Sequence, residues 1–284
     1  MRVTPALLCL TLWHTACPAQ ARQPAYPPYS IFNTEIRFLY SAAAGRVYKI
    51  FVNLPRAYHQ EPERRYPTLY ILDPAAHFGM VTDMQRLFED GRRIEPVITI
   101  GVGYETILSD SLGQYREHDM TPTRVHPNSG GGPAFLTFIE TELIPFVEAQ
   151  YRVDPGIRGY WGGSYGGLFG AYALLARPGL FQRMILTSPT VAWDGDALFK
   201  REQALADTAD ALPTLVYIAA GGAEDEGWML GPLRRFVAQL KSRGYEGLQI
   251  DLDIVPGEDH FSIAPLGIAR GLMRMFARPP EEHR

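Results

Sequence analysis

The chain has 284 residues, of which 46% are apolar and 20% are charged, and its formal net charge at pH 7 is −4. This composition is typical of a globular protein that is long enough to bury one large core. Mild acidity without a block of basic residues disfavours nucleic acid or an anionic membrane surface as a partner, and we expect neither.

The first 21 residues have the pattern of a secretory signal peptide. Arg2 is followed by an apolar run over residues 6–13, and Ala19 and Ala21 form a small-x-small cleavage site. The run is shorter than the roughly 20 apolar residues that span a bilayer, so we expect no stable membrane insertion. We therefore predict cleavage after Ala21 and an exported protein, either periplasmic or secreted.

Cys17 offers an alternative, because small residues before a cysteine are found where a lipoprotein anchor is attached. The anchor is disfavoured, since no aliphatic residue stands at the position that a lipobox requires. Cleavage after Ala21 removes both cysteines of the chain, Cys9 and Cys17, and leaves no thiol or disulfide. An exported chain without disulfides suits a bacterial periplasm at least as well as a harsher exterior.

Residues 22–36 are predicted to form an extended lead-in, because their first part is rich in proline. We expect a single domain over residues 37–278 and a charged tail over residues 279–284. Within the domain, short apolar runs typical of strands alternate with longer amphipathic segments typical of helices.

The expected strands are residues 46–54, 68–72, 97–102, 159–162, 183–186, 214–220 and 248–255. The expected helices are residues 135–147, with a kink or restart at Pro145, and residues 168–175, 228–240 and 268–276. Such alternation predicts the α/β class, with a mostly parallel sheet covered by helices on both faces. Ligands of such sheets bind at the carboxyl ends of the strands, where we therefore searched for the site.

A Gly-x-Ser-x-Gly motif stands between a predicted strand and a predicted helix, with Ser164 at its centre. The turn is so tight that side chains at Gly162 and Gly166 are expected to collide, and Gly167 is expected to allow close packing. Ser164 is therefore predicted to be a nucleophile, and the amide of Tyr165 to stabilise the oxyanion. The alternative is an incidental serine in a glycine-rich turn. The pattern of a phosphate-binding loop is absent from the sequence.

A serine nucleophile needs a general base, which in this arrangement follows the serine and the acid in the chain. His260 fits this order, because it lies between the last predicted strand and the last predicted helix. The acid is expected after the strand at 214–220, where Glu224, Asp225 and Glu226 follow one another. Spacing alone does not select among them; we favour Glu224, with Asp225 as the second choice.

A second oxyanion amide is expected in a loop over residues 73–78, after the strand at 68–72. Pro74 has no N–H to donate, so the amide of Ala75 is favoured. His77 in the same loop either lines the pocket or has a structural role. The expected aromatic candidates for contact with an aryl ester are Tyr104, Tyr115 and Trp193, although aromatic residues also simply pack.

Assembled in this way, the chain resembles the putative-esterase family of α/β-hydrolases. This family includes siderophore esterases, S-formylglutathione hydrolase, feruloyl-esterase domains and mycolyltransferases, and exported bacterial siderophore-esterase-like hydrolases are the nearest subgroup. The resemblance runs from about Arg37 to Phe276. The segments that carry it are residues 66–78, 116–122, 161–167, 188–194 and 257–260.

The resemblance implies an α/β-hydrolase fold and a Ser–acid–His machinery without a metal or cofactor. It also implies that Arg116 holds an anionic substrate, with a structural Arg116–Asp119 pair as the alternative. The chain departs from the family pattern at two positions. Gly163 stands where a histidine usually precedes the nucleophile, and Pro74 stands where a glycine usually follows the strand-end aspartate.

We therefore expect a serine esterase that cleaves a small-molecule ester through an acyl-enzyme, with a siderophore trilactone as a candidate substrate. Three alternatives remain at this point: an acyltransferase of the same fold, a peptidase, and a catalytically inactive ligand-binding protein. The peptidase is disfavoured, because the sequence shows no propeller or second domain. The natural ester and the oligomeric state do not follow from the sequence.

Overall fold

The computed structural model describes residues 29–106 and 109–278 of the chain. The predicted signal peptide at 1–21, residues 22–28 of the lead-in and the charged tail at 279–284 lie outside the described residues, as do Cys9 and Cys17. None of the described helices has the length and apolar character needed to cross a membrane. The first strand begins at Thr34, inside the range 22–36 that the sequence indicated as lead-in.

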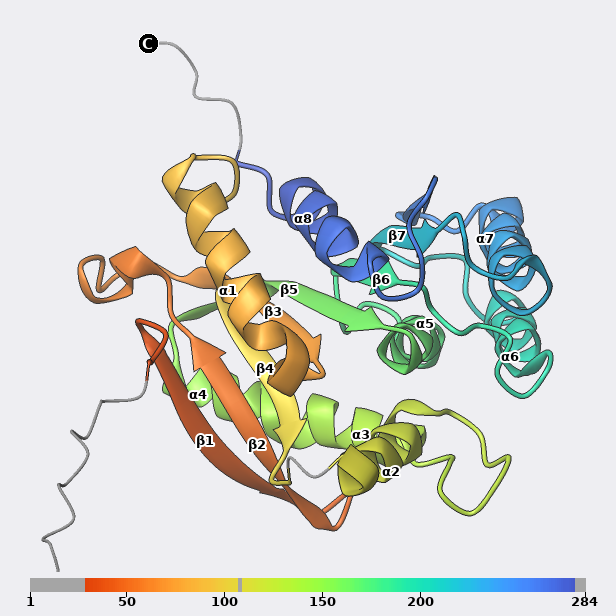
Figure 1. Ribbon diagram of the computed structural model, residues 1–284, viewed down its shortest axis with the longest axis horizontal. Coiled ribbons are helices and arrows are strands. Elements are labelled where there is room, and N and C mark those ends of the chain that lie inside the picture. Colours follow the sequence, from red (N-terminus) through yellow and green to blue (C-terminus); the bar gives the residue numbers. More distant parts are fainter. Residues whose placement is uncertain (1–28, 107–108, 279–284) are drawn as a thin grey trace, which may run out of the picture. The chain divides into compact units, whose positions relative to one another are not determined.

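Eight strands form one sheet in the order β1-β2-β4-β3-β5-β6-β7-β8 (Figure 1). β2 pairs with β1 and β4 in the antiparallel sense, and the pairs from β4 through to β8 are parallel. This mostly parallel sheet confirms the predicted α/β class. The strands are β1 Thr34–Ser41, β2 Arg46–Asn53, β3 Tyr66–Leu72, β4 Ile98–Tyr104, β5 Val153–Gly163, β6 Arg183–Thr187, β7 Leu215–Gly221 and β8 Gln249–Val255.

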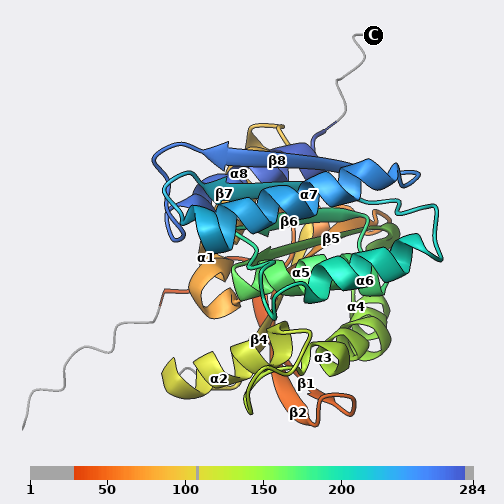
Figure 2. The same cartoon turned by 90° about the vertical axis from the view of Figure 1, so that its right-hand side faces the viewer.

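Helices cover both faces of this sheet (Figures 1 and 2). α1 and α8 lie on one face, where Phe78, Val81 and Ile268 join one hydrophobic cluster. The helices α3, α4, α5 and α7 pack on the other face around a second cluster. The helices are α1 Pro74–Asp90, α2 Ser109–Met120, α3 Gly132–Phe138, α4 Ile144–Gln150, α5 Tyr165–Ala176, α6 Ala197–Ala206, α7 Gly231–Arg243 and α8 Ile263–Met275.

Burial on both faces explains why the central strands are continuous apolar runs. Every residue of β3 and β4 is buried, as is typical of parallel strands between two helical layers. The carboxyl ends of these strands, together with those of β5, β7 and β8, lie at one edge of the sheet. That edge carries the candidate site.

The segment around Pro145 shows how the fold accommodates a proline inside a helix. A π-helical turn over Ile139–Leu143, labelled η2, joins α3 to α4, and Pro145 lies in the first turn of α4. Proline lacks the N–H that would bond four residues back, and its ring clashes with that carbonyl, so a wider turn relieves both problems. The predicted restart at Pro145 therefore takes the form of a π-turn.

The structure corrects the sequence prediction at three helices. The segment 73–78, expected to be a loop, contains the start of α1, and α2 and α6 lie in stretches that were left without structure. The face of α1 that is buried includes the polar residues Thr82 and Gln85, which blurs its apolar stripe. The sequence of α2 is largely polar, so helical periodicity gives no signal there.

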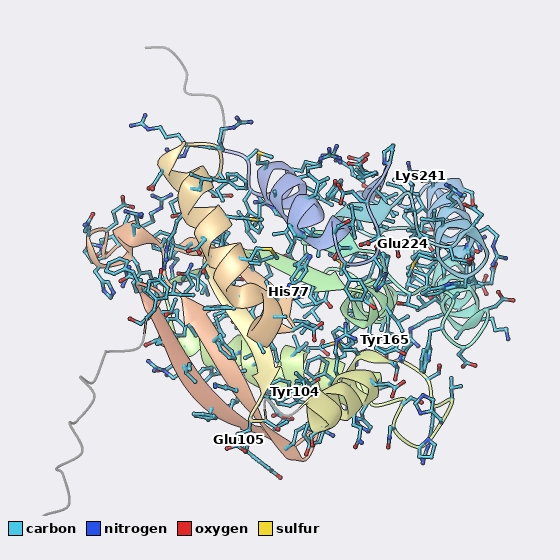
Figure 3. The ribbon with its side chains drawn as sticks, in the orientation of Figure 1. His77, Tyr104, Glu105, Tyr165, Glu224 and Lys241 are labelled. Carbon is cyan, nitrogen blue, oxygen red and sulfur yellow. The ribbon has the colours of Figure 1, made fainter. Side chains whose placement is uncertain are left out.

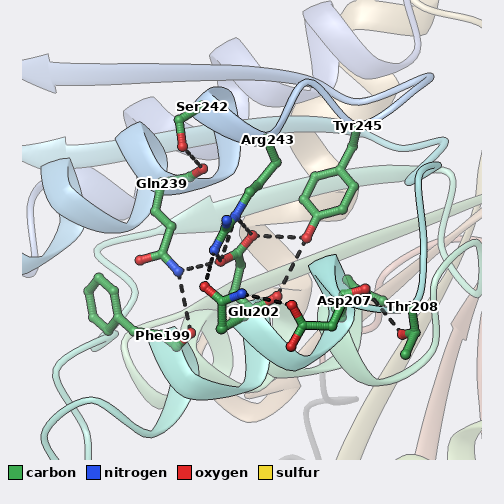
Figure 4. Close-up of polar contacts among 10 residues, drawn as sticks. Phe199, Glu202, Asp207, Thr208, Gln239, Ser242, Arg243 and Tyr245 are labelled. Atoms are coloured by element: carbon green, nitrogen blue, oxygen red, sulfur yellow. Dashed lines mark hydrogen bonds and ion pairs between the residues drawn. The ribbon is translucent and has the colours of Figure 1, made fainter.

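A buried carboxylate joins α6 to α7 beside the start of β8 (Figure 4). Glu202 is fully buried and accepts hydrogen bonds from Nε of Arg243 at 3.0 Å and from the hydroxyl of Tyr245 at 2.9 Å. The amide of Gln239 donates to the same carboxylate. Burial by itself raises the pKa of a carboxyl group, but these donors together hold the pKa of Glu202 below its ordinary value.

Glu202→Gln is expected to lower the free energy of unfolding at neutral pH by about 2 kcal/mol, because Arg243 loses its buried partner. The carboxyl group of Glu202 has a lower pKa in the folded protein than in the unfolded chain, where it is about 4.3. Its ionised form therefore stabilises the fold at pH values above 4.3, and this stabilisation is lost as the pH falls through the pKa of the folded state. The gap between variant and wild type therefore narrows towards about pH 3. Urea unfolding of both proteins at pH 7 and at about pH 3 measures this difference in unfolding free energy, and Glu63→Gln at an exposed position is the control. A difference that does not depend on pH would contradict the ion-pair account.

Candidate active site

Ser164 occupies a strained turn between β5 and α5. Its backbone has φ 56° and ψ −116°, outside the regions that non-glycine residues ordinarily adopt. The N–H of Ser164 donates to the carbonyl of Thr187 on β6 at 2.9 Å, which ties the turn to the neighbouring strand. This geometry pushes the serine side chain out at the edge of the sheet, as in a nucleophile elbow.

Close contacts explain two of the three glycines next to the elbow, Gly162 and Gly167, but not Gly166. A Cβ at Gly162 would lie 2.5 Å from the carbonyl of Gly166, and one at Gly167 would lie 2.8 Å from Pro189. A Cβ at Gly166 would have its nearest neighbour in the side chain of Leu72 at 3.6 Å, which is an ordinary contact. The collision predicted at Gly166 is therefore wrong, because this residue already belongs to the first turn of α5 and faces β3.

His260 and Glu224 lie in contact after the last two strands of the sheet. Nδ1 of His260 is 2.7 Å from Oε2 of Glu224, which follows β7. Oε1 of Glu224 accepts hydrogen bonds from the N–H of Gly221 at 2.8 Å and from the hydroxyl of Ser188. Burial by itself raises the pKa of this carboxyl, but its donors hold the pKa of Glu224 below its ordinary value. An ionised carboxylate only accepts, so Nδ1 carries the proton and Nε2 is free to accept one.

The two other carboxylates of this loop have different partners. Asp225 accepts hydrogen bonds from the N–H groups of Gly227 and Trp228 and so caps the π-helical turn η3, Glu226–Leu230. Glu226 forms an ion pair with Arg234 on α7. Sequence spacing left open which of Glu224, Asp225 and Glu226 is the acid. Glu224 is the one of the three that contacts His260, which favours Glu224.

A cavity of about 720 Å³ brings most of the predicted site residues together. Its volume is in the range of small-molecule sites. Ser164, His260, Ala75, His77 and Arg116 all line it. Figure 3 labels His77 on α1, Tyr104 at the end of β4, Tyr165 at the start of α5 and Glu224 after β7, all around this edge of the sheet.

The two predicted oxyanion donors both belong to the first turns of helices. Ala75 follows Pro74 at the start of α1, and Tyr165 begins α5 directly after Ser164. Amides at these positions have no acceptor within their own helix, and the helix dipole favours negative charge there. Asp73, which precedes α1, has a positive φ of 53°. Its carbonyl accepts from the N–H groups of Ala76 and His77, at 3.1 and 3.2 Å.

Comparison with known proteins agrees with this geometry. The model of the family described as "Putative esterase" matches residues 41–247. The chain is 30% identical over 273 residues to the ferri-bacillibactin esterase BesA of Bacillus subtilis, covering 89% of this chain and 92% of that protein. It is 27% identical to the siderophore triacetylfusarinine C esterase of Aspergillus fumigatus, covering 88% and 95%. The crystal structure of the BES protein from Bacillus cereus superimposes with a TM-score of 0.78 at 27% identity, covering 90% and 99%.

The chain belongs to the putative esterase family. It is therefore a serine hydrolase of carboxylic esters, related to siderophore esterases, and its fold is that of the α/β-hydrolases. The resemblance inferred from the sequence motifs is confirmed.

Arg116 of this esterase has its guanidinium bound within the protein. Nε lies 2.8 and 2.9 Å from the two carboxylate oxygens of Asp73, and the terminal nitrogen donates to the carbonyl of Gly163 at 3.2 Å. The guanidinium also lies over the ring of Tyr165, 5.3 Å from its centroid. The alternative of a structural pair with Asp119 is wrong as to the partner. Arg116 pairs with Asp73, and Asp119 accepts from the hydroxyl of Tyr48 on β2.

The aromatic residues proposed from the sequence divide into two groups. Tyr104 and His77 line the cavity of the esterase, and burial lowers the pKa of His77, which favours its neutral form. Trp193 is not among the described residues that line the cavity. Its Nε1 donates to Thr123, and its ring lies edge-on to Tyr165 at 5.6 Å, so it supports the elbow from outside. Tyr115 also lies outside the described cavity lining.

Several lining residues escaped the sequence analysis. Lys49 and Phe51 on β2 line the cavity, as do Thr187 at the end of β6 and Phe261 after His260. The alternation of polar and apolar residues in β2 predicted a strand, but it did not indicate that one face of this strand reaches the site. A Cβ at Gly163 would lie 2.9 Å from Oγ1 of Thr187, which gives a steric reason for glycine where the family usually has histidine.

Glu224→Gln is expected to lower kcat by about 10²–10⁴-fold, because an amide neither fixes the His260 tautomer nor stabilises the imidazolium. Asp225→Asn and Glu226→Gln serve as matched controls, since both carboxylates bond elsewhere, and each should stay within about twofold of wild type. Steady-state kinetics on a chromogenic ester, with circular dichroism to verify folding, measures the effect. A larger loss in either control than in Glu224→Gln would refute the assignment of the acid.

Proposed function

We propose that this esterase cleaves its substrate by two-step acyl transfer with Ser164 as nucleophile. Oγ of Ser164 attacks the ester carbonyl while Nε2 of His260 takes its proton. The amides of Tyr165 and Ala75 hold the oxyanion. His260 returns the proton to the leaving alcohol, and it then activates the water that releases the acid from Ser164.

One observation carries this proposal. A strained serine and a histidine line the same cavity, and the histidine is bonded at 2.7 Å to a nearly fully buried carboxylate. An ionised Glu224 in that position stabilises the imidazolium that forms when His260 accepts a proton. A binding protein without catalytic activity has no need of the strained backbone at Ser164, whose conformation costs about 1–3 kcal/mol.

We further propose that the natural substrate is a siderophore of the ester type, with a trilactone as the first candidate. The support comes from relatives named as siderophore esterases in bacteria and fungi, two of them matching nearly 90% of this chain. A cavity of about 720 Å³ gives a large ester room beside the nucleophile. Apolar and aromatic residues such as Phe51, Tyr104, Trp161 and Phe261 make up much of its wall.

The assay that tests this function compares p-nitrophenyl acetate, butyrate and octanoate with a catecholate trilactone. The wild type is expected to hydrolyse both classes with the trilactone preferred in kcat/KM, and Ser164→Ala is expected to lose about 10⁴-fold or more in kcat without a change in folding. Full activity in Ser164→Ala would overturn the assignment. Ester formation with added alcohol in place of hydrolysis would indicate an acyltransferase, and a folded but inert wild type would indicate a binding protein.

We also propose that the chain is exported after removal of residues 1–21, on the basis of its N-terminal sequence pattern alone. Expression of the full chain in a Gram-negative host is expected to give a periplasmic protein that begins at Arg22. Mass spectrometry of its N-terminus measures this. An intact Met1, or a chain that begins at an acylated Cys17, would contradict the predicted cleavage.

A further inference from the structure

The sheet face next to the active-site cavity is uncovered at its β1 edge. Ile36, Phe38 and Tyr40 alternate along β1 and are exposed by 46%, 59% and 63%. Side chains two residues apart share a face of a strand, so these three form one apolar surface. Large apolar side chains that gather on one face indicate a contact surface, whereas single ones do not.

The strand register connects this surface to the cavity. Phe38 is the cross-strand partner of Lys49, and Ile36 is the partner of Phe51. Directly paired residues lie on the same face of the sheet with their Cβ atoms about 5 Å apart. Because Lys49 and Phe51 line the cavity, the exposed side chains of β1 extend its wall outward.

The next strand, β4, contributes glycines to the same face. Lys49 pairs with Gly103, and a Cβ at Gly103 would lie 2.9 Å from the ring of Pro74. The first turn of α1 therefore rests directly on β4. On β2, Phe51 packs against Phe78 of α1 with 5.4 Å between the ring centroids, and the face of β1 beyond it is left exposed. A continuous floor runs from Ala75, the predicted oxyanion donor, across Gly103 and Lys49 to Phe38.

Lys49 contributes a positive charge to this floor. Its ammonium lies 5.2 Å from the ring centroid of Phe51, and none of the carboxylates whose side chains the structure describes forms an ion pair with it. Glu105 directly follows β4 and is exposed to solvent (Figure 3). The other cation of the cavity, Arg116, is bound to Asp73 and Gly163.

We propose that Lys49, Phe51 and Phe38 form a subsite for an anionic aromatic group carried by the substrate at a distance from the scissile ester. The rings of Phe51 and Phe38 supply a flat apolar surface for an aryl group. The ammonium of Lys49 pairs with a carboxylate or phenolate on that group. This inference rests on the proposed esterase function, because it concerns how the substrate of Ser164 is selected.

The occupant is argued from charge and from continuity with the cavity. A neutral aliphatic chain would leave the charge of Lys49 without a partner, and a cationic group would be repelled by it. An anionic ring satisfies both the aromatic surface and the ammonium. Binding energy gained here, away from the reacting carbonyl, holds the ester in place for attack.

The test uses p-nitrophenyl esters of 6-phenylhexanoic acid whose remote ring bears a para hydrogen, carboxylate or trimethylammonium group. For the wild type, we expect kcat/KM for the ester with the carboxylate (the carboxylate arm) to exceed kcat/KM for the ester with hydrogen (the neutral arm) by about fivefold. This preference should become smaller as salt is added. Lys49→Met, which keeps the length of the side chain, is expected to bring this ratio close to one. Phe38→Ser is expected to lower kcat/KM for all three arms.

Lys241→Met is the matched control, because this exposed lysine lies on α7, away from the cavity residues His77 and Tyr104 (Figure 3). It should leave the ratio of carboxylate to neutral arm as in the wild type. An unchanged ratio in Lys49→Met would overturn the subsite. A Phe38→Ser variant that alters only a monomer–dimer equilibrium would assign this face to a second copy of the chain and overturn it as well.

Failure of the subsite is separable from failure of the esterase function. Calorimetric titration of the same three esters into Ser164→Ala measures the preference for the anionic arm without turnover, and adding Lys49→Met to that background should abolish the preference. If hydrolysis depends on Ser164 but Lys49→Met has no effect on the preference, the esterase function is supported and the subsite is refuted. A Lys49-dependent affinity without any hydrolysis supports the subsite and refutes the esterase.

Discussion

The positive φ of Ser164 is the constraint around which the site is built. A residue in this conformation costs about 1–3 kcal/mol, which the surrounding structure has to offset. The backbone around Ser164 is held on both sides. Its N–H bonds the carbonyl of Thr187, and its carbonyl accepts from the N–H of Leu168 on α5 at 2.9 Å. The buried strands β5 and β6 thereby fix a turn that an isolated peptide would not adopt.

The same strand edge orients the rest of the catalytic set. Ser188 follows β6 directly, has a positive φ of 42° and donates its hydroxyl to Glu224. Its N–H donates to the carbonyl of Ala219 on β7 at 2.8 Å, so the position of this hydroxyl is set by the sheet. Successive strands β5, β6, β7 and β8 thus lead to the proposed nucleophile, to a residue that supports the proposed acid, to that acid and to the proposed base. Parallel strand order converts a sequence separation of almost a hundred residues into contact at one edge.

The ion pair between Arg116 and Asp73 couples the two predicted oxyanion donors. Asp73 immediately precedes the turn that carries Ala75, and Gly163, whose carbonyl also binds Arg116, immediately precedes Ser164 and Tyr165. One guanidinium on α2 therefore holds the ends of the neighbouring strands β3 and β5 in fixed relation. Removing one oxyanion-hole donor costs about 3–4 kcal/mol in transition-state stabilisation. If Ala75 and Tyr165 act as proposed, this spacing therefore matters for rate as well as for stability.

The sequence allowed every strand except β1, and the tight turn at Ser164, to be predicted, because these features depend on local patterns. Continuous apolar runs mark buried strands, and the glycines around Ser164 mark a tight turn between strand and helix. The choice of Glu224 over Asp225 and Glu226 depended on a contact between segments after β7 and β8, which no local pattern encodes. Helix α2 was missed for a related reason, since its polar sequence has no apolar stripe, and with it the true partner of Arg116 was missed.

The two cationic side chains of the cavity, Arg116 and Lys49, differ in how readily they can pair with a charged group of the substrate. Arg116 resembles an arginine that holds anionic substrates in related enzymes. Here its Nε donates to Asp73 and one terminal nitrogen donates to Gly163, so moving the guanidinium towards a ligand would disturb both bonds. Lys49 faces the same cavity from β2, and no described carboxylate pairs with its ammonium, which lies near the ring of Phe51. Breaking a half-buried ion pair costs more than pairing a partly exposed ammonium gains, so discrimination by charge falls to Lys49. In the proposed mechanism, selection of the substrate by charge and positioning of the oxyanion donors are then assigned to separate cations, Lys49 and Arg116.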